Sequence, residues 1–361
     1  MGDPAGIGPE IIAKAFRDTP SALAGCFVAG DVAVMRRAAA CLRTDGPPGA
    51  SGTGMNTAIA WAIAQIQSPD DLSQVPPRCL PVLQVPPAGD LNPLSASRGA
   101  LPAWGQISAT AGQMAGQAVV WAARAALRGE IAALVTAPLH KEALALAGPP
   151  FDQFPGHTEL LQAEAAAFKG LPVSAMPVRM MLANDELRTV LVSIHLSLQS
   201  AIHAVTRDSV QQTLQIAHDG LSKILGRVPH LGVAGLNPHA GEGGLFGREE
   251  LDIIGPAISA ARARGLWVSG PFAPDTVFMR ARARPGSAGE FDAVIAMYHD
   301  QGLIPVKYMG VEHGVNVTLG LPLVRTSPDH GTAFDIAGQG LADAASLVQA
   351  VRVAKSMAGW A

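Results

Sequence analysis

Three histidines, far apart in the chain, have the surroundings that metal ligands need. His195 and His299 follow apolar, β-branched runs at 189–194 and 293–297, as side chains at the ends of buried strands do. His239 stands in a glycine-containing turn. Neutral imidazoles held rigidly, with an open side for substrate, suit zinc, cobalt or a similar divalent cation. We therefore expect the three to bind one cation, although any one of them alone is more often a partly buried histidine without a ligand.

Further polar residues follow the third histidine. Asp300 suits a partner that fixes a histidine tautomer, and equally a turn-forming residue. Lys307, Asn316 and Arg325 are spaced through apolar segments. Arg325 follows the apolar run 319–324, and its paired donors suit a carboxylate or a phosphate. For Lys307 an ordinary surface position is nearly as good an interpretation.

Glycine-rich segments supply a second kind of candidate. The loop 2–10 would bring backbone N–H groups close to an anionic or polar ligand, or would simply be a tight turn. The segment 154–159 predicts a helix that begins near His157 and Thr158, where the helix dipole favours an anion; the alternative is that Thr158 only caps the helix. The segment 329–340 permits close approach of a flat ligand such as adenine, or is an ordinary glycine-rich connection.

Two absences in the sequence narrow the options. No Gly-x-Gly-x-x-Gly fingerprint is present, so a Rossmann-type dinucleotide site is not supported. A loop such as 2–10 is usually preceded by a strand, and only Met1 precedes it here. We therefore expect a truncated N-terminus.

Short β-branched runs alternate with longer helical patterns, which predicts an α/β protein with a largely parallel sheet. The predicted strands cover 131–135, 179–182, 189–194, 231–234 and 293–297. The predicted helices cover 109–128, a segment from Thr206 or Asp208 to 221, 247–265 and 341–357. Pro-, Gly- and Ser-rich composition at 46–54 and 68–93 predicts surface loops.

Bulk properties exclude several classes. A length of 361 residues predicts two lobes. A net charge of −3 with scattered basic residues gives no reason to expect nucleic acid, and no apolar stretch is long enough to predict a membrane partner. No signal peptide is visible. Cys26, Cys41 and Cys79 have no Cys-x-x-Cys spacing and predict reduced thiols in a cytoplasmic protein.

Taken together, these segments resemble the 4-hydroxythreonine-4-phosphate dehydrogenase family of vitamin B6 biosynthesis and its relatives acting on other four-carbon phosphates. The motifs that carry the resemblance are Gly-Asp-Pro-Ala-Gly-Ile-Gly-Pro-Glu at 2–10, Pro-Gly-His-Thr-Glu at 155–159, Gly-Leu-Asn-Pro-His-Ala-Gly-Glu-Gly-Gly at 235–244, Met-Tyr-His-Asp-Gln-Gly at 297–302 and Asp-His-Gly-Thr-Ala at 329–333. The resemblance runs from Gly2 to the last helix, and only 46–93 matches no motif of the family.

The resemblance implies a two-lobed α/β fold like that of isocitrate and isopropylmalate dehydrogenases, with a cleft between the lobes. We expect 1–129 with 271–361 to form a cofactor lobe, and 130–270 to form the substrate, metal and dimerisation lobe. The implied cofactors are NAD or NADP and one divalent metal ion per subunit (Zn, Mg or Co), bound by His195, His239 and His299 and shared across a homodimer interface. Substrate contacts would come from His157, Thr158, Lys307, Asn316 and Arg325, and cofactor contacts from His330, Gly331, Thr332, Ala333 and Asp335.

The implied reaction is oxidation of a secondary alcohol of a phosphorylated hydroxy acid, followed by loss of CO2. The expected substrate is 4-(phosphooxy)-L-threonine, with 3-amino-2-oxopropyl phosphate as product. Lys307 and Asp300 are the candidate catalytic residues. Two alternatives stay open: a 4-phospho-D-threonate or erythronate dehydrogenase of sugar-acid catabolism, and a metal-dependent lyase or hydrolase without nicotinamide. An aromatic dihydrodiol dehydrogenase is less favoured because the Gly-His-Thr motif is kept, and a non-catalytic binding protein leaves the clustered polar residues unexplained.

Overall fold

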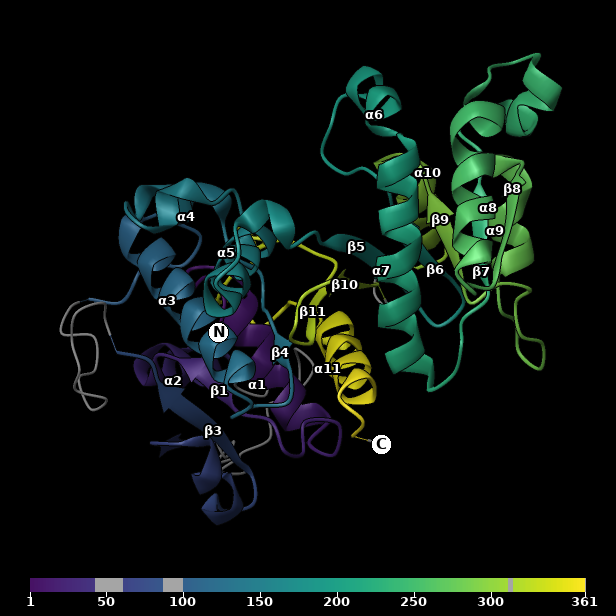
Figure 1. Cartoon of the computed structure of the whole chain (residues 1–361). Coiled ribbons are helices and arrows are strands. Elements are labelled where there is room, and N and C mark those ends of the chain that lie inside the picture. Colours follow the sequence, from purple (N-terminus) through teal and green to yellow (C-terminus); the bar gives the residue numbers. More distant parts are fainter. Residues whose placement is uncertain (43–60, 87–99, 311–313, 361) are drawn as a thin grey trace. The chain divides into compact units, whose positions relative to one another are not determined.

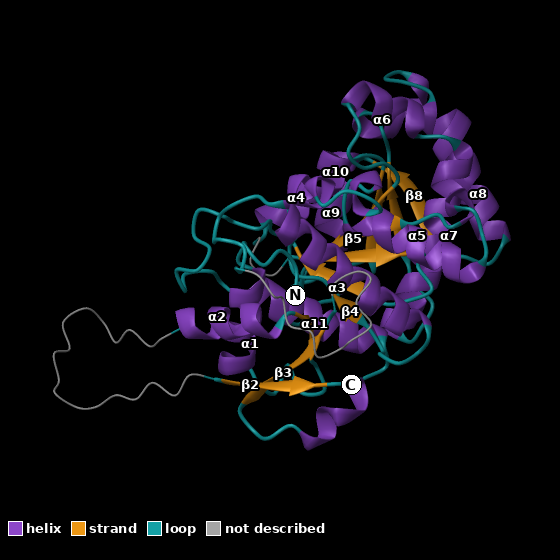
Figure 2. Ribbon diagram, turned by 90° about the vertical axis from the view of Figure 1, so that its left-hand side faces the viewer, coloured by secondary structure: helices purple, strands orange, loops and turns teal. Residues whose placement is uncertain are grey.

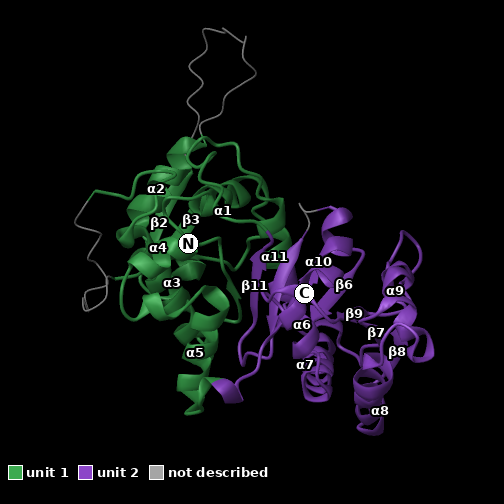
Figure 3. Cartoon of the chain, turned by 90° about the horizontal axis from the view of Figure 1, so that it is seen from above, with its two compact units in different colours: residues 1–173, 330–352 green, residues 174–329, 353–361 purple. Residues whose placement is uncertain are grey.

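The computed structural model describes residues 1–42, 61–86, 100–310 and 314–360 (Figure 1). The chain divides into two compact units, 1–173 with 330–352 (unit 1) and 174–329 with 353–361 (unit 2) (Figure 3). Helices and strands are present in both, so the predicted α/β class is confirmed (Figure 2). None of the helices in the described ranges is long and apolar enough to cross a membrane.

Unit 1 is built on a small parallel sheet. Its strands follow the order β1 (Val28–Gly30), β3 (Cys79–Gln84), β2 (Ala62–Ile66). Two helix starts are explained by their caps: Asp31 accepts the N–H of Val34, and Ser108 accepts that of Ala111. The other elements of the unit are α1 (Gly8–Asp18), α2 (Val32–Cys41), η1 (Pro69–Gln74), α3 (Ala109–Leu127), β4 (Leu134–Val135), α4 (Lys141–Leu146), η2 (Phe151–Gln153), α5 (His157–Lys169) and most of α11 (Ala345–Met357).

The core of unit 1 forms where α1, the sheet and α11 meet. Ile11 of α1, Leu80 and Val82 of β3 and Val351 of α11 are almost completely buried in one cluster. Burial of such aliphatic side chains contributes on the order of 2 kcal/mol each. This core places the loop 2–7 and the segment 330–342 against the same set of apolar residues.

Unit 2 contains a larger sheet whose two halves differ in strand direction. Its strands follow the order β11-β10-β5-β6-β9-β7-β8. From β11 to β6 neighbouring strands are antiparallel, and from β6 to β8 they are parallel. The strands are β5 (Arg179–Ala183), β6 (Arg188–Leu191), β7 (Leu231–Ala234), β8 (Val268–Phe272), β9 (Ala293–Ala296), β10 (Val315–Leu319) and β11 (Arg325–Pro328).

Helices cover both faces of this sheet. In Figure 3, α7 (Arg207–Leu225) and α8 (Gly255–Ala263) lie on one side, and α9 (Pro274–Ala281) and α10 (His299–Tyr308) on the other. Phe278 of α9 and Leu303 of α10 pack with Val294 of β9 in one buried cluster. The remaining elements are η3 (Val173–Ala175), α6 (Leu198–Ala204), η4 (Pro238–Gly244) and η5 (Glu250–Ile254).

Two predictions about organisation differ from the structure. Residues 271–329 do not group with the N-terminal segment, because β9 pairs with β6 and β7 and so belongs to unit 2. The boundaries at 129/130 and 270/271 are therefore replaced by 173/174 and 329/330. The sheet is also less parallel than predicted, since β10 and β11 form an antiparallel half.

One predicted surface loop is wrong in part. Within 68–93, Cys79–Gln84 forms the central strand of the unit 1 sheet, with Leu80 and Val82 fully buried. The strand was not predicted because it contains Pro81 and is flanked by further prolines. Proline is normally confined to the edge strands of a sheet. The predicted loop at 46–54, and 87–93 of the second, lie outside the described residues.

Candidate active site

His195 and His299 are brought together by the pairing of β6 with β9. Beyond the last paired residues, Val192 N–H donates to Ala296 O (2.9 Å) and the Ser193 hydroxyl donates to Met297 O (2.9 Å). The segments that follow β6 and β9 therefore leave the sheet side by side. The ring centroids of His195 and His299 lie 5.6 Å apart, with the planes tilted by 42°.

The orientation of each imidazole is set locally. His195 has a left-handed backbone (φ 39°), which is uncommon for a residue with a side chain and is typical of functional sites. Nδ1 of His299 lies 2.7 Å from Oδ1 of Asp300. A carboxylate at Nδ1 leaves Nε2 as the nitrogen able to face a metal. Two adjacent imidazoles, one with a carboxylate partner, fit a divalent cation.

His239 lies in a turn held by a buried carboxylate. Oε1 of Glu250 accepts the N–H groups of Leu236 (2.7 Å) and Asn237 (2.8 Å), and Oε2 accepts Nδ2 of Asn237 (3.0 Å). Beyond this brace the backbone turns left-handed, at φ 54° for His239 and 53° for Ala240. The turn is therefore fixed by Glu250 rather than by a regular helix.

A carboxamide links the turn to the start of α10. Gln301 accepts the N–H of Met297 (2.7 Å) through Oε1 and donates through Nε2 to Gly235 O (2.8 Å). The ends of β9 and β7 are thus tied by one side chain. Even so, the described residues contain no group of three His, Cys, Asp or Glu placed to hold one metal ion, so the structure brings together His195 and His299 but not His239 with them.

Apolar side chains are exposed beside all three histidines. Leu196 (51% exposed) directly follows His195, and Leu245 (74%) directly follows the turn that carries His239. On α10, which begins at His299, Ile304 and Tyr308 are exposed as well. Exposed apolar side chains thus follow each of the three histidines in the sequence.

Lys307 and Asn316 meet at a third residue, Asp329. Nζ of Lys307, in the last turn of α10, lies 2.6 Å from Oδ2 of Asp329. Nδ2 of Asn316, on β10, donates to Oδ1 of the same carboxylate at 2.8 Å. The Asp329 side chain is 7% exposed and that of Lys307 40%. The two predicted substrate residues are therefore joined by a buried carboxylate that sequence reasoning did not single out.

Arg325 differs from its prediction. A position directly after the apolar run 319–324 gives no sign of burial, but the residue is buried at the start of β11. Nη1 donates to the Thr318 hydroxyl on the neighbouring strand at 3.0 Å. A guanidinium is a planar fork of donors, the chemical type that binds carboxylates and phosphates.

In unit 1, His157 and Thr158 form the first turn of α5 as predicted. The N-cap is Gly156, and no side chain caps the helix. The alternative that Thr158 serves only as the cap is therefore wrong. The first N–H groups of a helix lack partners within it and favour an anion.

The predicted cofactor segment is held against the loop 2–10. Ile7 N–H donates to Thr332 O (2.9 Å), and a Cβ on Gly6 would lie 2.9 Å from that oxygen, so the approach requires glycine. Ala333 is left-handed (φ 40°). His330 and Gly331 precede this contact and Asp335 follows it, its carbonyl accepting Nε2 of Gln339.

Glu10 also holds the segment 329–340 and the residues just after it in place. Its fully buried carboxylate accepts the N–H groups of Gly338 (3.1 Å) and Ala342 (2.9 Å). The sequence around Glu10 shows only a glutamate after a glycine-rich loop. It contains no pattern that predicts contacts with residues more than 300 positions away. The same holds for Glu250 and Asp329, whose partners are far away in the sequence.

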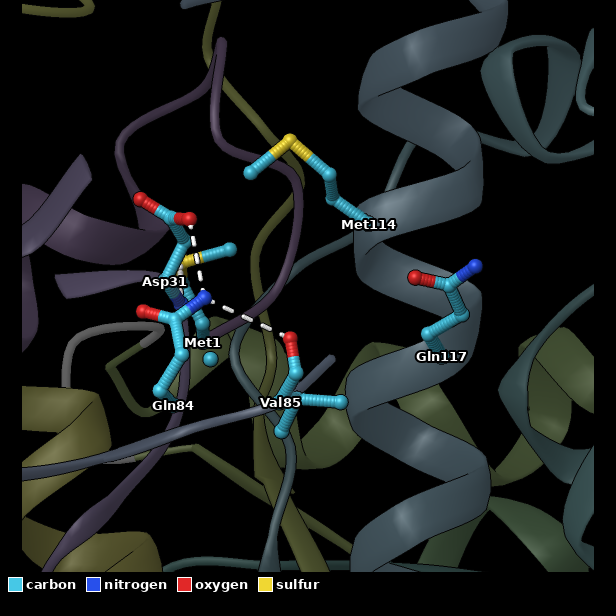
Figure 4. Close-up of a pocket in the computed structure, with 7 residues that line it drawn as sticks. Met1, Asp31, Gln84, Val85, Met114 and Gln117 are labelled. Carbon is cyan, nitrogen blue, oxygen red and sulfur yellow. Dashed lines mark hydrogen bonds between the residues drawn. The ribbon is translucent and has the colours of Figure 1, made fainter. Parts of the chain in front are cut away.

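Unit 1 also contains a pocket next to the first residue of the chain. Met1, Asp31, Gln84, Val85, Met114 and Gln117 line it together with Gly30 (Figure 4). The Gln84 amide is occupied by Asp31 Oδ2 and Val85 O. None of the predicted site residues lines this pocket.

The structure is that of an α/β protein. It has two adjacent imidazoles at strand ends, a lysine–carboxylate–carboxamide cluster, and a helix that begins without a side-chain cap. The comparisons narrow the class further. Residues 22–354 match the family model "Pyridoxal phosphate biosynthetic protein PdxA", and the chain belongs to this family.

Named relatives carry two activities. The chain is 50% identical over 349 residues to 4-hydroxythreonine-4-phosphate dehydrogenase of Beijerinckia indica subsp. indica, covering 96% of this chain and 90% of that one. It is 40% identical to D-threonate 4-phosphate dehydrogenase of Salmonella typhimurium, covering 99% and 97%. The crystal structure of 4-hydroxythreonine-4-phosphate dehydrogenase from Klebsiella pneumoniae superimposes with a TM-score of 0.78 at 36% identity, covering 99% and 98%.

Proposed function

We propose that this chain is a metal-dependent NAD(P) dehydrogenase that oxidises and decarboxylates 4-(phosphooxy)-L-threonine. The product is 3-amino-2-oxopropyl phosphate, a precursor in pyridoxal phosphate biosynthesis. The observation that carries the proposal is the 50% identity over 349 residues to a dehydrogenase of that name. The geometry supports it, because the residues needed for a cation and for an anionic substrate stand at the ends of sheet strands and at a helix start.

A zinc, magnesium or cobalt ion fits the paired imidazoles of His195 and His299. When bound, such an ion makes a coordinated hydroxyl more acidic and stabilises negative charge beside a carbonyl. NAD or NADP supplies the hydride acceptor. We assign the cofactor contacts to His330, Gly331, Thr332, Ala333 and Asp335, where the backbone is held firmly by the loop 2–10.

The chain's own residues orient the substrate and move one proton. The N–H groups at the start of α5, with His157 and Thr158, bind one anionic end, and Arg325 binds another. The Asn316 amide is fixed in place. Loss of CO2 leaves a carbon that must take up a proton, and Lys307 Nζ is the donor. Asp300 holds the His299 tautomer at Nδ1, so its part in catalysis is that of a positioning residue.

We further propose a homodimer in which the partner supplies His239 to the cation held by His195 and His299. Two features support this arrangement: among the described residues of one chain the three histidines form no metal-binding group, and exposed apolar residues follow each of them in the sequence. A twofold interface applies the same surface twice, so each dimer would hold two such sites.

Subunit complementation tests the shared site. His239→Ala and His299→Ala proteins should each be inactive, because each lacks a ligand in both sites. Mixed after dissociation, they should regain about one quarter of wild-type activity, since half of the dimers are mixed and each of these has one complete site. No recovery in dimers shown by mass spectrometry to be mixed would mean that all three ligands belong to one protomer.

A substrate panel tests the activity itself. Purified protein would be given four-carbon phosphates with NAD or NADP, with and without chelator, while reduced nicotinamide is followed by absorbance. The proposal expects turnover of 4-(phosphooxy)-L-threonine that chelator abolishes. Product formation without nicotinamide reduction would establish a lyase or hydrolase instead.

A second candidate substrate is 4-phospho-D-threonate or 4-phospho-D-erythronate. It is favoured by the 40% identity to D-threonate 4-phosphate dehydrogenase over almost the whole chain. The candidate substrates differ mainly at C2, which carries an amine in the threonine compound and a hydroxyl in the sugar acids. The ratio of kcat/KM for the two kinds of substrate decides which one the enzyme prefers.

A further inference from the structure

We propose that Asp329 is a positioning residue that places the Lys307 ammonium and fixes the Asn316 amide for the reaction. This proposal rests on the proposed function, because it takes Lys307 as the proton donor. It adds a residue that acts through its two partners and does not touch the substrate.

The contacts show what the carboxylate does. Asp329 follows directly after β11, and its two oxygens reach different elements: Oδ2 lies 2.6 Å from Lys307 Nζ on α10, and Oδ1 accepts Nδ2 of Asn316 on β10. Oδ1 accepts a hydrogen bond and Oδ2 forms the ion pair with the ammonium, so the two contacts use different oxygens and are present at once. The position of Lys307 Nζ therefore depends on a residue next to strand β11, and not only on the end of α10.

The exposure of the pair argues that more than packing is involved. Asp329 is 7% exposed but Lys307 is 40% exposed, so the carboxylate is enclosed while the lysine side chain stays accessible. An ammonium has three N–H donors, and contact with one carboxylate oxygen leaves donors for a ligand. This access is what a proton donor to a bound substrate needs.

Asn316 is fixed in a second sense. Its Nδ2 donates to Asp329. If the amide group turned over, Oδ1 of Asn316 would face the carboxylate of Asp329, which is unfavourable because both are acceptors. Its Oδ1 has no hydrogen-bond partner among the described residues. Asp329 thus decides that Asn316 offers an acceptor, and a ligand atom that meets it must be a donor.

The test compares Asp329→Asn, Lys307→Met and the double variant with the control Glu290→Gln. Glu290 forms an exposed ion pair with Arg280 in the same unit, so the control removes an equal charge elsewhere. Asp329→Asn should lower kcat by about 100-fold, because a small misplacement of a reacting group has that effect. Asp329→Asn keeps an oxygen that can accept Asn316 Nδ2, so its effect on kcat should act through Lys307, and the double variant should be no slower than Lys307→Met. Asp329→Glu should recover part of the loss.

A second readout does not depend on activity. Acylation of Lys307 by a lysine-directed reagent, followed by mass spectrometry, should be severalfold faster in Asp329→Asn than in wild type or Glu290→Gln. If Asp329→Asn unfolds, the double variant still answers, since it leaves no unpaired charge behind. Unchanged labelling, or a double variant clearly slower than Lys307→Met, would overturn the proposal. A wild type that reduces no nicotinamide would refute the proposed function, while the labelling would still report on the contact.

Discussion

Each unit holds a glycine-rich segment in place with a buried glutamate, but the two segments face different surroundings. In unit 1, Glu10 accepts N–H groups from 338 and 342, and the segment beginning at 330 packs against the loop 2–10. In unit 2, Glu250 accepts N–H groups from 236 and 237, and the turn that follows ends in the exposed Leu245.

The difference fits the two roles proposed above for these segments. The unit 1 segment packs against the loop 2–10, as the platform proposed for the cofactor would need. The unit 2 turn carries a histidine outward beside apolar side chains, which suits a group delivered to a partner chain. Rigid support from a buried carboxylate is common to both, since a buried charge is stable only when its oxygens are hydrogen-bonded.

The largest expected contrast comes from replacing the histidine of each segment. His239→Ala should lower kcat/KM by about 1000-fold or more, because metal assistance contributes several kcal/mol and each 1.4 kcal/mol is tenfold. His330→Ala should mainly raise the KM for the nicotinamide. Steady-state kinetics with metal content by mass spectrometry measures both, with His218→Ala on α7 as the control. Equal losses of kcat in the two variants would remove the distinction.

Replacing each glutamate sharpens the comparison at the next level. Glu250→Gln and Glu10→Gln should each destabilise the fold by about 1.5–3 kcal/mol, because one N–H group in each then faces an amide NH2. Only Glu250→Gln should also weaken metal binding, by about 10–100-fold, the usual effect of losing a group that orients a ligand. Denaturant titration and metal titration separate the two effects. Weaker metal binding in Glu10→Gln would contradict the assignment.

The two units should also respond to pH in opposite ways through a pair of aspartates. Burial raises the pKa of Asp3 in the loop 2–10, although the N–H of Ala5 opposes this. Burial would also raise the pKa of Asp292, but its hydrogen bonds from Arg227 and from the N–H of His230 outweigh it and hold that pKa below its ordinary value.

The sign of each effect follows from proton linkage. Asp292 contributes stability above the unfolded value of about 4, and this is lost as the pH falls through the lower folded value. For Asp3 the folded protein holds its proton more tightly, so stability falls as the pH rises from about 4 through the folded value. Unfolding midpoints against pH should show Asp292→Asn approaching wild type below pH 4, and Asp3→Asn gaining on wild type above it. Parallel curves would contradict both.

The smallest effect concerns one left-handed alanine in each segment. Ala240 (φ 53°) and Ala333 (φ 40°) are strained, and glycine relieves a left-handed conformation by about 1–2 kcal/mol. The flexibility of unfolded glycine offsets part of this, so Ala240→Gly and Ala333→Gly should each stabilise by about 0.5 kcal/mol. Ala163→Gly inside α5 should destabilise by about 1 kcal/mol. Destabilisation in all three would show that the turns are held without strain.

Local patterns predicted a good part of this molecule. Thr206 caps α7 by accepting the N–H of Ser209, as the sequence suggested, and α3 matches its predicted range almost to the residue. The five predicted strands all overlap observed ones, since each is an apolar run. Arg325–Pro328 was missed because its residues are polar or proline, yet all four are buried between neighbours that the sequence does not reveal.

The candidate site shows the same limit. The residue types of His195 and His299, and their positions after strands, were readable from the sequence, and pairing of β6 with β9 then brings the rings together. The role of Asp329 was not readable, because its partners are 22 and 13 positions away and lie on other elements. Local reasoning finds reactive groups, whereas the groups that orient them depend on the tertiary fold.

The Gln301 carboxamide restricts which sequences this fold can accept at that position. It must present an acceptor to Met297 N–H and a donor to Gly235 O at the same time. Glutamate has the length but no donor, and asparagine has both groups but one methylene less. Related chains that keep both histidine segments should therefore show glutamine here, even though this side chain takes no part in the reaction.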